Sequence, residues 1–222
     1  MKNEHKPPAS AKAARNATTA DLILDVAEAL FAQQGYNGAS IRDITAQAGT
    51  NLGAVTYHFG TKENLLTAIL ARGAAALNEE RNRRLALIEQ GLVAPSVESV
   101  LRAFIEPMFD LLKAPSGVQF LRIQSDVSAE RTDVPREILS LHYDPCARHF
   151  MRLLATVSPH LSSDSLVWNF EFILGAVLYC LTRPRRFPDM RENESMQGWR
   201  ERQLDELIRF LANAVAPHAA RT

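Results

Sequence analysis

The segment AGTNLGAVTYHFGTKENL, residues 48–65, concentrates side chains that can hydrogen-bond to a nucleic acid. Thr50 and Asn51 can reach the backbone or base edges, and Thr56 offers both a hydroxyl and a methyl group to base edges. Tyr57 and His58 can contact phosphates at the wall of a groove. A soluble core needs no exposed aromatic pair, so the segment predicts a surface shaped to meet a partner.

Two short helices must position these side chains. Ser40 is expected to cap the first, in SIRDITAQAG, with Asp43 completing a capping box and Gly49 ending the helix. Asn51 can cap the second, in LGAVTYHF. This order predicts a helix-turn-helix motif, whose second helix enters the major groove while the first crosses the backbone.

Each remaining position on the motif has an expected role. Ser40 and the amides beside it can bind a phosphate, and Gly53 keeps the second helix small enough to approach DNA. Lys62 can contact a phosphate. In the alternative interpretation Tyr57 and His58 are ordinary helix-end residues; we favour DNA contact because Val55 and an inward-packing Phe59 already occupy the positions that face inward. The predicted DNA-contacting residues are Ser40, Arg42, Thr50, Asn51, Leu52, Gly53, Thr56, Tyr57, His58 and Lys62.

The flanking sequence has helical periodicity throughout and no convincing strand. A first helix is expected at residues 19–34, capped by Thr18 or Thr19 and stopped by Gly35. Thr61 caps a fourth helix that continues toward Gly91. Five further helices are expected at about residues 97–113, 117–129, 134–157, 163–182 and 199–215. The predicted fold is all-α with about nine helices, in which a three-helix DNA-binding domain precedes a larger helical bundle.

The expected domains are a flexible basic arm at residues 1–18, a helix-turn-helix domain at 19–70 and a ligand-binding and dimerisation domain at 71–222. The first 20 residues carry a surplus of three positive charges, from Lys2, Lys6, Lys12 and Arg15 against Glu4. Arms of this kind are usually disordered leaders but can contact phosphates.

The composition predicts a soluble protein with a real core. The 222 residues are 46% hydrophobic and 23% charged, and we find no apolar run near the roughly 20 residues of a membrane span. Residues 1–19 lack the apolar region of a secretory signal, and Cys146 and Cys180 lie far apart, so we expect a cytoplasmic protein with free thiols and no membrane partner. The formal net charge of zero gives no support to bulk binding of nucleic acid.

The segment GASIRDITAQAGTNLGAVTYHFGTKENLLTAIL resembles the DNA-binding segment of the tetracycline-repressor (TetR) family of bacterial transcriptional regulators. The match covers about residues 19–70 and includes Ile41-Arg42-Asp43-Ile44, Tyr57-His58-Phe59 and Lys62-Glu63. The chain departs from the common pattern at Asn51, where the family often has Ser, and at Val55-Thr56, where it often has Leu-Tyr; these differences affect which bases are read. The resemblance implies a homodimer that binds a palindromic operator and releases it when a small molecule enters the C-terminal domain.

The C-terminal half is expected to hold the effector in an apolar cavity with few polar anchors. In the alternative interpretation these residues form a plain helical core, and Arg122 pairs internally with Glu171. VLRAFIEPMFDLL, FLRIQSDV and WNFEFILGAVLYCL resemble a branch with regulators that respond to fatty acids and acyl-CoA thioesters. The predicted ligand contacts are Phe104, Met108, Phe120, Arg122, Gln124, Tyr143, Cys146, Trp168, Asn169 and Phe172.

Other functions have less support in the sequence. His142, Cys146 and His149 have the spacing of one helical face, but Pro145 interrupts that helix and no fourth ligand is obvious, so we predict no metal and no cofactor. A small-molecule enzyme or carrier is the alternative, yet no phosphate loop, carboxylate pair or nucleophile elbow is present. A DNA-organising protein would leave the large helical domain without a role. We expect a ligand-responsive regulator, most simply a repressor, and not an enzyme; the last two helices are its expected dimer surface.

Overall fold

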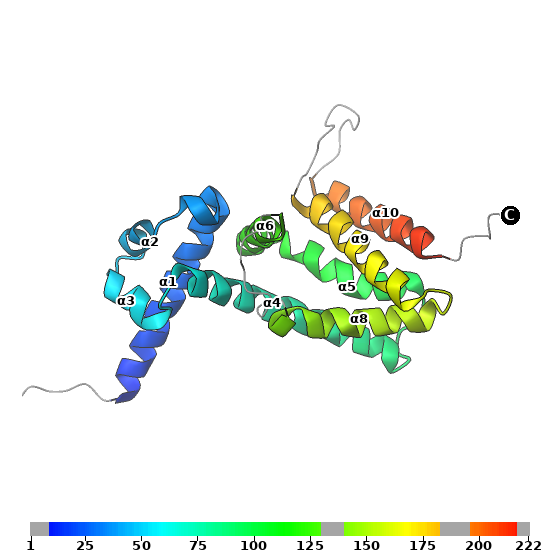
Figure 1. Cartoon of the computed structure of the whole chain (residues 1–222), viewed down its shortest axis with the longest axis horizontal. Coiled ribbons are helices and arrows are strands. Elements are labelled where there is room, and N and C mark those ends of the chain that lie inside the picture. Colours follow the sequence, from blue (N-terminus) through cyan, green and yellow to red (C-terminus); the bar gives the residue numbers. More distant parts are fainter. Residues whose placement is uncertain (1–8, 130–139, 183–195, 217–222) are drawn as a thin grey trace, which may run out of the picture. The chain divides into compact units, whose positions relative to one another are not determined.

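The computed structural model describes residues 9–129, 140–182 and 196–216, and its regular elements in these ranges are all α-helices (Figure 1). This confirms the predicted all-α class. The helices are α1 (Ala9–Gly38), α2 (Ile41–Gln47), α3 (Leu52–His58), α4 (Lys62–Glu89), α5 (Val97–Leu111), α6 (Pro115–Ala129), α8 (Asp144–Val157), α9 (Ser163–Thr182) and α10 (Met196–Val215).

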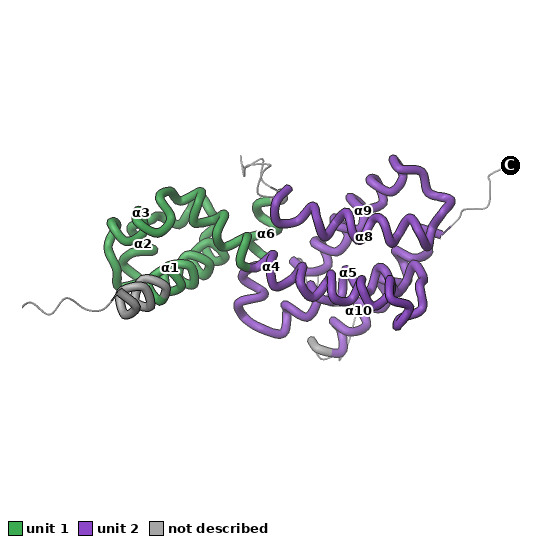
Figure 2. The backbone as a smooth tube through the Cα atoms, turned by 90° about the horizontal axis from the view of Figure 1, so that it is seen from below, with its two compact units in different colours: residues 1–72, 122–134 green, residues 73–121, 135–222 purple. Residues whose placement is uncertain are grey.

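The chain forms two compact units, which Figure 2 shows in green and purple. Unit 1 comprises Met1–Arg72 and Arg122–Val134, and unit 2 comprises Gly73–Leu121 and Pro135–Thr222. Two helices therefore contribute to both units: α4 passes from unit 1 to unit 2 at Gly73, and α6 passes from unit 2 to unit 1 at Arg122.

Unit 1 is built on the apolar face of α1. The buried side chains of this unit include Ile23, Ala27, Leu30 and Phe31 of α1, Ile44 of α2, Val55 of α3 and Leu65, Leu66 and Ile69 of α4. The helix begins at Ala9, ten residues before the predicted start, so Thr19 is not its cap. The predicted stop at Gly35 is a kink with φ of 74°, a left-handed conformation that glycine adopts without strain, and helical turns resume up to Gly38. Leu22, which the predicted stripe included, is 48% exposed.

An ion-pair cluster joins α4 to α1 in unit 1. The two terminal nitrogens of Arg72 reach the carboxylates of Asp25 at 2.7 Å and Glu28 at 2.5 Å. Glu28 is almost completely buried, and a charge in that position needs a partner. Arg72 therefore fixes how the beginning of α4 packs on α1.

Unit 2 is organised around α5. Ser96 caps this helix and Ser99 completes the capping box, while Phe104, Ile105 and Met108 are among its buried side chains. Helix α5 contacts α8 and α10, and α9 contacts the same two helices. Arg102 of α5 pairs with Asp205 of α10 at 2.8 Å. Gly73 is required where α4 meets α6, because a Cβ there would lie 2.2 Å from the ring of Phe120.

The predicted single helix at residues 134–157 is wrong at its middle, and its first residues lie outside the described ranges. The chain turns at Tyr143, and α8 begins at Asp144 with Pro145 in its first turn. Proline has no amide hydrogen and its ring blocks a continuing helix, but it fits the first helical turn. The turn separates His142 from Cys146 and His149, which removes their shared helical face.

Helix α9 is unusual because few of its apolar residues are buried. By length and composition it could cross a membrane, contrary to the sequence-based expectation, although core helices of soluble proteins pass the same criterion. Helix α9 packs against α8 and α10 through Ile173, Val177 and Leu181, so one face does belong to the core of unit 2. Both cysteines are free thiols, as expected.

Candidate nucleic-acid interface

The caps of α2 and α3 hold the motif in place. The Ser40 hydroxyl accepts a hydrogen bond from the Asp43 amide at 3.2 Å, and the Ser40 amide donates to the Asp43 carboxylate at 3.2 Å. These bonds, the Ser40 side chain first, lower the pKa of Asp43. At α3 the Asn51 side-chain oxygen accepts from the Ala54 amide at 3.0 Å. Gly49 lies between the helices with φ of 60°, so the turn uses a conformation that favours glycine. Both predicted caps are confirmed.

Helix α3 presents one apolar anchor and one open face. Val55 is 2% exposed, whereas Leu52 is 60% and Tyr57 is 75% exposed. Gly53 and Thr56 are exposed beside Leu52 and Tyr57. The Thr56 hydroxyl donates a hydrogen bond to the Leu52 carbonyl at 3.0 Å. The Tyr57 ring meets His58 edge-on at 5.0 Å between centroids. Large apolar or aromatic groups on an open helical face are typical of a surface that binds a partner.

The other predicted contact residues lie in the same unit but are not equally free. Arg42 is exposed, Thr50 and His58 are half-buried, and Phe59 is half-buried rather than a full core residue. Ser40 is exposed, yet Asp43 engages both its hydroxyl and its amide. The carboxylate places a negative charge beside the groups that were predicted to contact a phosphate, and this charge repels an anion.

Lys62 is directed toward aromatic rings. Its ammonium lies 4.3 Å from the centroid of Tyr36 and 5.8 Å from that of Phe31, and burial lowers its pKa. The Tyr36 hydroxyl donates to Glu63 at 3.1 Å; burial, with help from Glu63, raises the pKa of Tyr36 to about 12. Lys62 thus stabilises the α1–α4 contact inside unit 1, which the sequence did not predict.

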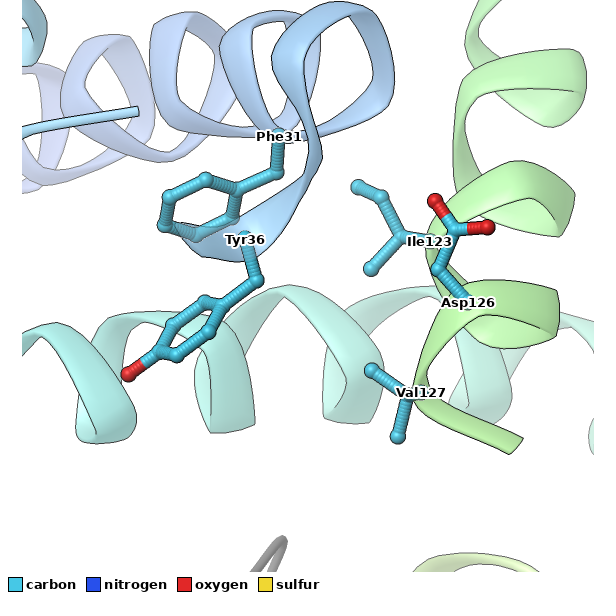
Figure 3. Close-up of a pocket in the computed structure, with 5 residues that line it drawn as sticks. All are labelled: Phe31, Tyr36, Ile123, Asp126 and Val127. Atoms are coloured by element: carbon cyan, nitrogen blue, oxygen red, sulfur yellow. The ribbon is translucent and has the colours of Figure 1, made fainter. Parts of the chain in front are cut away.

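A small cavity in unit 1 lies between the end of α1 and α6 (Figure 3). Phe31 and Tyr36 line it from α1, and Ile123, Asp126 and Val127 line it from α6. Its volume of about 10 Å³ corresponds to a single water molecule, so it is a packing defect rather than an effector site.

Two family models match the chain. One described as "Bacterial regulatory proteins, tetR family" matches residues 23–69, and one described as "Tetracyclin repressor-like, C-terminal domain" matches residues 102–214, just over half of the chain. The chain belongs to the TetR family. Helix α3 is therefore the second helix of a TetR helix-turn-helix motif. Membership in a family of transcriptional regulators also agrees with the expectation that the protein is not an enzyme.

Curated TetR relatives have names of the same kind. The transcriptional repressor AcnR of Corynebacterium glutamicum is 32% identical over 112 residues, a match that spans 50% of each chain. The transcriptional dual regulator CecR of Shigella flexneri is 30% identical over 174 residues, which is 70% of this chain and 72% of that protein. The match thus spans only half the length of AcnR.

Solved structures support the TetR fold. The structure of AibR in complex with isovaleryl coenzyme A and operator DNA superposes with a TM-score of 0.65 at 20% identity, over 86% of this chain and 97% of that one. At this identity the similarity establishes the fold alone.

The predicted ligand residues differ in burial. Phe104, Met108, Phe120 and Cys146 are buried, and Tyr143 is half-buried with a buried hydroxyl. Trp168 and Phe172 were expected in the interior, which is wrong: they are 58% and 66% exposed on α9, and their rings stack at 6.3 Å. An apolar helix that a partner subunit could cover has the same sequence pattern as a core helix.

The predicted polar anchors also differ in exposure and in hydrogen bonding. Arg122 and Glu171 are both exposed, Asn169 donates back to the Ser165 carbonyl at 2.8 Å, and Gln124 is half-buried. Arg122 and Gln124 fall in unit 1, whereas Asn169 belongs to unit 2. His149, considered above as a metal ligand, lies 3.0 Å from the side-chain oxygen of Asn82 and 3.2 Å from Glu89.

Sequence reasoning missed the buried cation of unit 2. Arg81 is 3% exposed although it lies in the polar run NEERNRR, which has the composition of a solvated helix face. Its position four residues after Leu77 and four before Leu85, both buried, is the signal that places it on the inner face of α4.

Proposed function

We propose that the protein is a ligand-responsive transcriptional repressor that binds a palindromic operator as a homodimer in the cytoplasm. The observation that carries this proposal is the exposed face of α3, where Leu52, Thr56 and Tyr57 surround the small Gly53 while Val55 anchors the helix. A helix of this kind fits the major groove, and the exposed groups have the chemistry to contact base edges and phosphates.

The exposed apolar face of α9 and α10 supports the homodimer. Its large side chains are Val167, Trp168, Phe172 and Tyr179 of α9 and Phe210 of α10. A Cβ at Gly175 would have no neighbouring atom of the described residues within 4 Å outside its own helical backbone, so α9 also has an open path for a neighbouring backbone. A second copy covering this face would bury it symmetrically, and a two-fold dimer requires a palindromic operator.

The path of α4 supports control by a small hydrophobic effector. The first part of α4 belongs to unit 1 and its remainder to unit 2. A ligand that binds unit 2 and favours another position of α4 there would therefore also shift the part of α4 that packs in unit 1. Two recognition helices that no longer match major grooves about 34 Å apart would release the operator. The AcnR name supports a repressor, while CecR is named a dual regulator, so the sign of control needs measurement.

The experiment is a mobility shift with the protein's own upstream intergenic DNA and random DNA as competitor. We expect selective binding by the wild type and at least tenfold weaker binding by Tyr57→Ala, because an exposed aromatic contact is lost from the reading helix. Leu92→Ala is the matched control: Leu92 is 70% exposed in the turn after α4 and should leave binding unchanged.

Three outcomes separate the parts of the proposal. Equal binding by the wild type and Tyr57→Ala would remove α3 from the interface. Binding to random DNA with the same affinity would favour a DNA-organising protein. A monomer in solution that binds the operator without a partner would contradict the palindrome.

A further inference from the structure

Arg81 carries a positive charge into the interior of unit 2 without a matching negative charge among the described residues. Its Nε donates to the Phe104 carbonyl at 2.8 Å, and one terminal nitrogen, Nη1, donates to the Asn78 side-chain oxygen at 3.3 Å. The other terminal nitrogen, Nη2, is buried and has no hydrogen-bond partner in the described part of the chain. The guanidinium lies over the Phe104 ring at 3.8 Å, and burial lowers its pKa to about 10.

Two further polar groups lie near this guanidinium. The Tyr143 hydroxyl is buried and has no partner among the described residues, and Cys146 is 2% exposed. The charge of Arg81 influences both groups, yet burial is the larger effect and raises the pKa of each above its usual value. Tyr143 and Cys146 are therefore neutral at physiological pH and do not balance the charge. We call Arg81, Asn78, Phe104, Tyr143 and Cys146 the Arg81 cluster.

A buried cation of this kind is costly unless something compensates it. Removing a guanidinium from water costs several kcal/mol, and an apolar side chain of the same length would avoid that cost. The Nε bond to the Phe104 carbonyl explains part of the arrangement, because it gives one N–H of the guanidinium a partner. It does not explain why the other terminal nitrogen of Arg81 and the Tyr143 hydroxyl have no partners among the described residues. Together these two donors can bind both oxygens of a carboxylate.

The neighbouring side chains indicate the remainder of the ligand. The ring centroids of Phe104 and Phe150 lie 4.4 Å apart with the rings tilted, and both rings approach Phe170 of α9, at 6.0 and 6.1 Å between centroids. Phe104 and Phe150 are fully buried, whereas Phe170 is half-buried and is the member best placed to move. A ligand with an apolar or aromatic body could therefore pack against these three rings in place of the contacts they now make with one another.

We propose that the effector is a hydrophobic monocarboxylic acid, whose carboxylate binds the free terminal nitrogen of Arg81 and the Tyr143 hydroxyl and whose apolar body packs against the Phe104–Phe150–Phe170 rings. This inference rests on the proposed function, because it names the effector class of the same C-terminal domain. It adds a residue of α4, the helix shared by both units, to the effector site.

The test is calorimetric titration of the full-length protein with octanoate, phenylacetate and 4-phenylbutyrate, each compared with its primary amide. We expect at least one acid to bind and its amide to bind at least tenfold more weakly, because the amide has the same body without the charge. Arg81→Met should weaken binding of that acid by roughly thirty-fold or more, and Tyr143→Phe by about tenfold. Arg83→Met, which removes an exposed guanidinium two residues further along α4, is the matched control and should bind as the wild type does.

The folding of the variants is checked by melting without ligand. Met is apolar and about as long as the Arg stem, so Arg81→Met should melt at the wild-type temperature or higher if Arg81 is kept for a ligand. If that variant fails to fold, Tyr143→Phe, which removes one unpartnered hydroxyl, still tests the site.

Several results would overturn the inference. These are equal affinity for acid and amide, unchanged binding in a folded Arg81→Met or in Tyr143→Phe, or no heat of binding from any of the three acids up to millimolar concentration. The mobility shift keeps this failure separate from failure of the proposed function. Operator binding without acid binding rejects the effector class alone, whereas acid binding without operator binding rejects the proposed regulator and leaves the carboxylate site.

Discussion

The face of α3 and the Arg81 cluster both carry polar chemistry, but at opposite extremes of burial. Tyr57 of α3 is 75% exposed and anchors nothing, while Arg81 is 3% exposed and lies against a phenylalanine ring. Exposed groups on a helix held by Val55 can change partner without disturbing the fold. A buried guanidinium is enclosed by packed side chains, so any ligand that reaches it changes the packing of unit 2.

In the proposed regulator, this difference separates DNA recognition from effector sensing. A surface that reads DNA works best when it is rigid before binding, which the caps at Ser40 and Asn51 provide. A sensor needs two arrangements of similar free energy, and an uncompensated charge lowers the stability of one of them. Substitutions in the two regions should therefore affect different quantities.

The largest effect is expected from Phe150, which is completely buried in unit 2. Phe150→Ala should lower the free energy of unfolding by about 3–5 kcal/mol, through lost burial and the cavity left behind. Tyr57→Ala should change it by less than about 0.5 kcal/mol, because surface substitutions rarely matter more. Urea unfolding followed by circular dichroism measures both, and similar losses in the two variants would contradict the contrast between the regions.

The next effect concerns the exposed face of α9. Phe172→Glu should weaken self-association by about 2–3 kcal/mol, roughly a hundred-fold, because a charge would be buried in an apolar contact. Sedimentation equilibrium measures this, with Leu92→Glu as the control at another exposed apolar position. A wild-type protein that is monomeric at micromolar concentration would contradict the dimer face, and unchanged association in Phe172→Glu would move the interface elsewhere.

The sequence predicted the exposed region better than the buried one. Caps and a turn glycine are local features, so Ser40, Asn51 and Gly49 could be placed before the structure was known. The inward position of Val55 followed from helical spacing alone. The contact of Lys62 with Tyr36 was not predicted, because it depends on how α4 packs against α1, which periodicity does not show.

In unit 2 the same reasoning failed for physical reasons. Trp168 and Phe172 lie on an apolar helix, and an apolar helix has the same pattern whether its cover is the chain's own core or a second subunit. Arg81 lies in a charged run, where solvation is the usual expectation and only the spacing of Leu77 and Leu85 indicates burial. Pro145 was recognised as a break when the metal site was rejected, but the bounds predicted for the helix at residues 134–157 did not use it.

The third prediction compares the two caps of the motif. Ser40→Ala and Asn51→Ala should each lower the free energy of unfolding by about 1 kcal/mol, because each leaves a helix amide without its acceptor. Operator affinity should separate them. Asn51 lies at the start of α3, where its side chain can reach base edges, whereas the hydroxyl and amide of Ser40 are engaged by Asp43. Asn51→Ala should therefore bind the operator about tenfold more weakly than Ser40→Ala does. Equal affinities in the mobility shift would show that Asn51 acts only as a cap.

The smallest expected change in the free energy of unfolding concerns the charged run of α4. There Arg83 and Arg84 pair with Glu80, whereas Arg81 has no acidic partner among the described residues. Glu80 accepts from Arg83 at 2.7 and 2.8 Å and from Arg84 at 2.6 Å, and these bonds, Arg83 first, lower its pKa from 4.5 to about 2. The folded state thus binds this proton less readily than the unfolded chain does. The stabilisation is present above pH 4.5 and is lost as the pH falls toward 2. Because the group is largely solvated, we expect only about 0.5 kcal/mol.

The measurement is the difference in unfolding free energy between wild type and Glu80→Gln at several pH values. The difference should be constant from pH 7 to about 5 and narrow below that, and 0.5 M salt should reduce it because exposed pairs are screened. Glu79→Gln, at an exposed position beside it, is the control. If this difference in unfolding free energy grows on acidification instead, the Glu80 carboxylate destabilises the folded helix. The charges of Arg83 and Arg84 would then not be compensated by Glu80, and these arginines would differ from Arg81 only in their exposure.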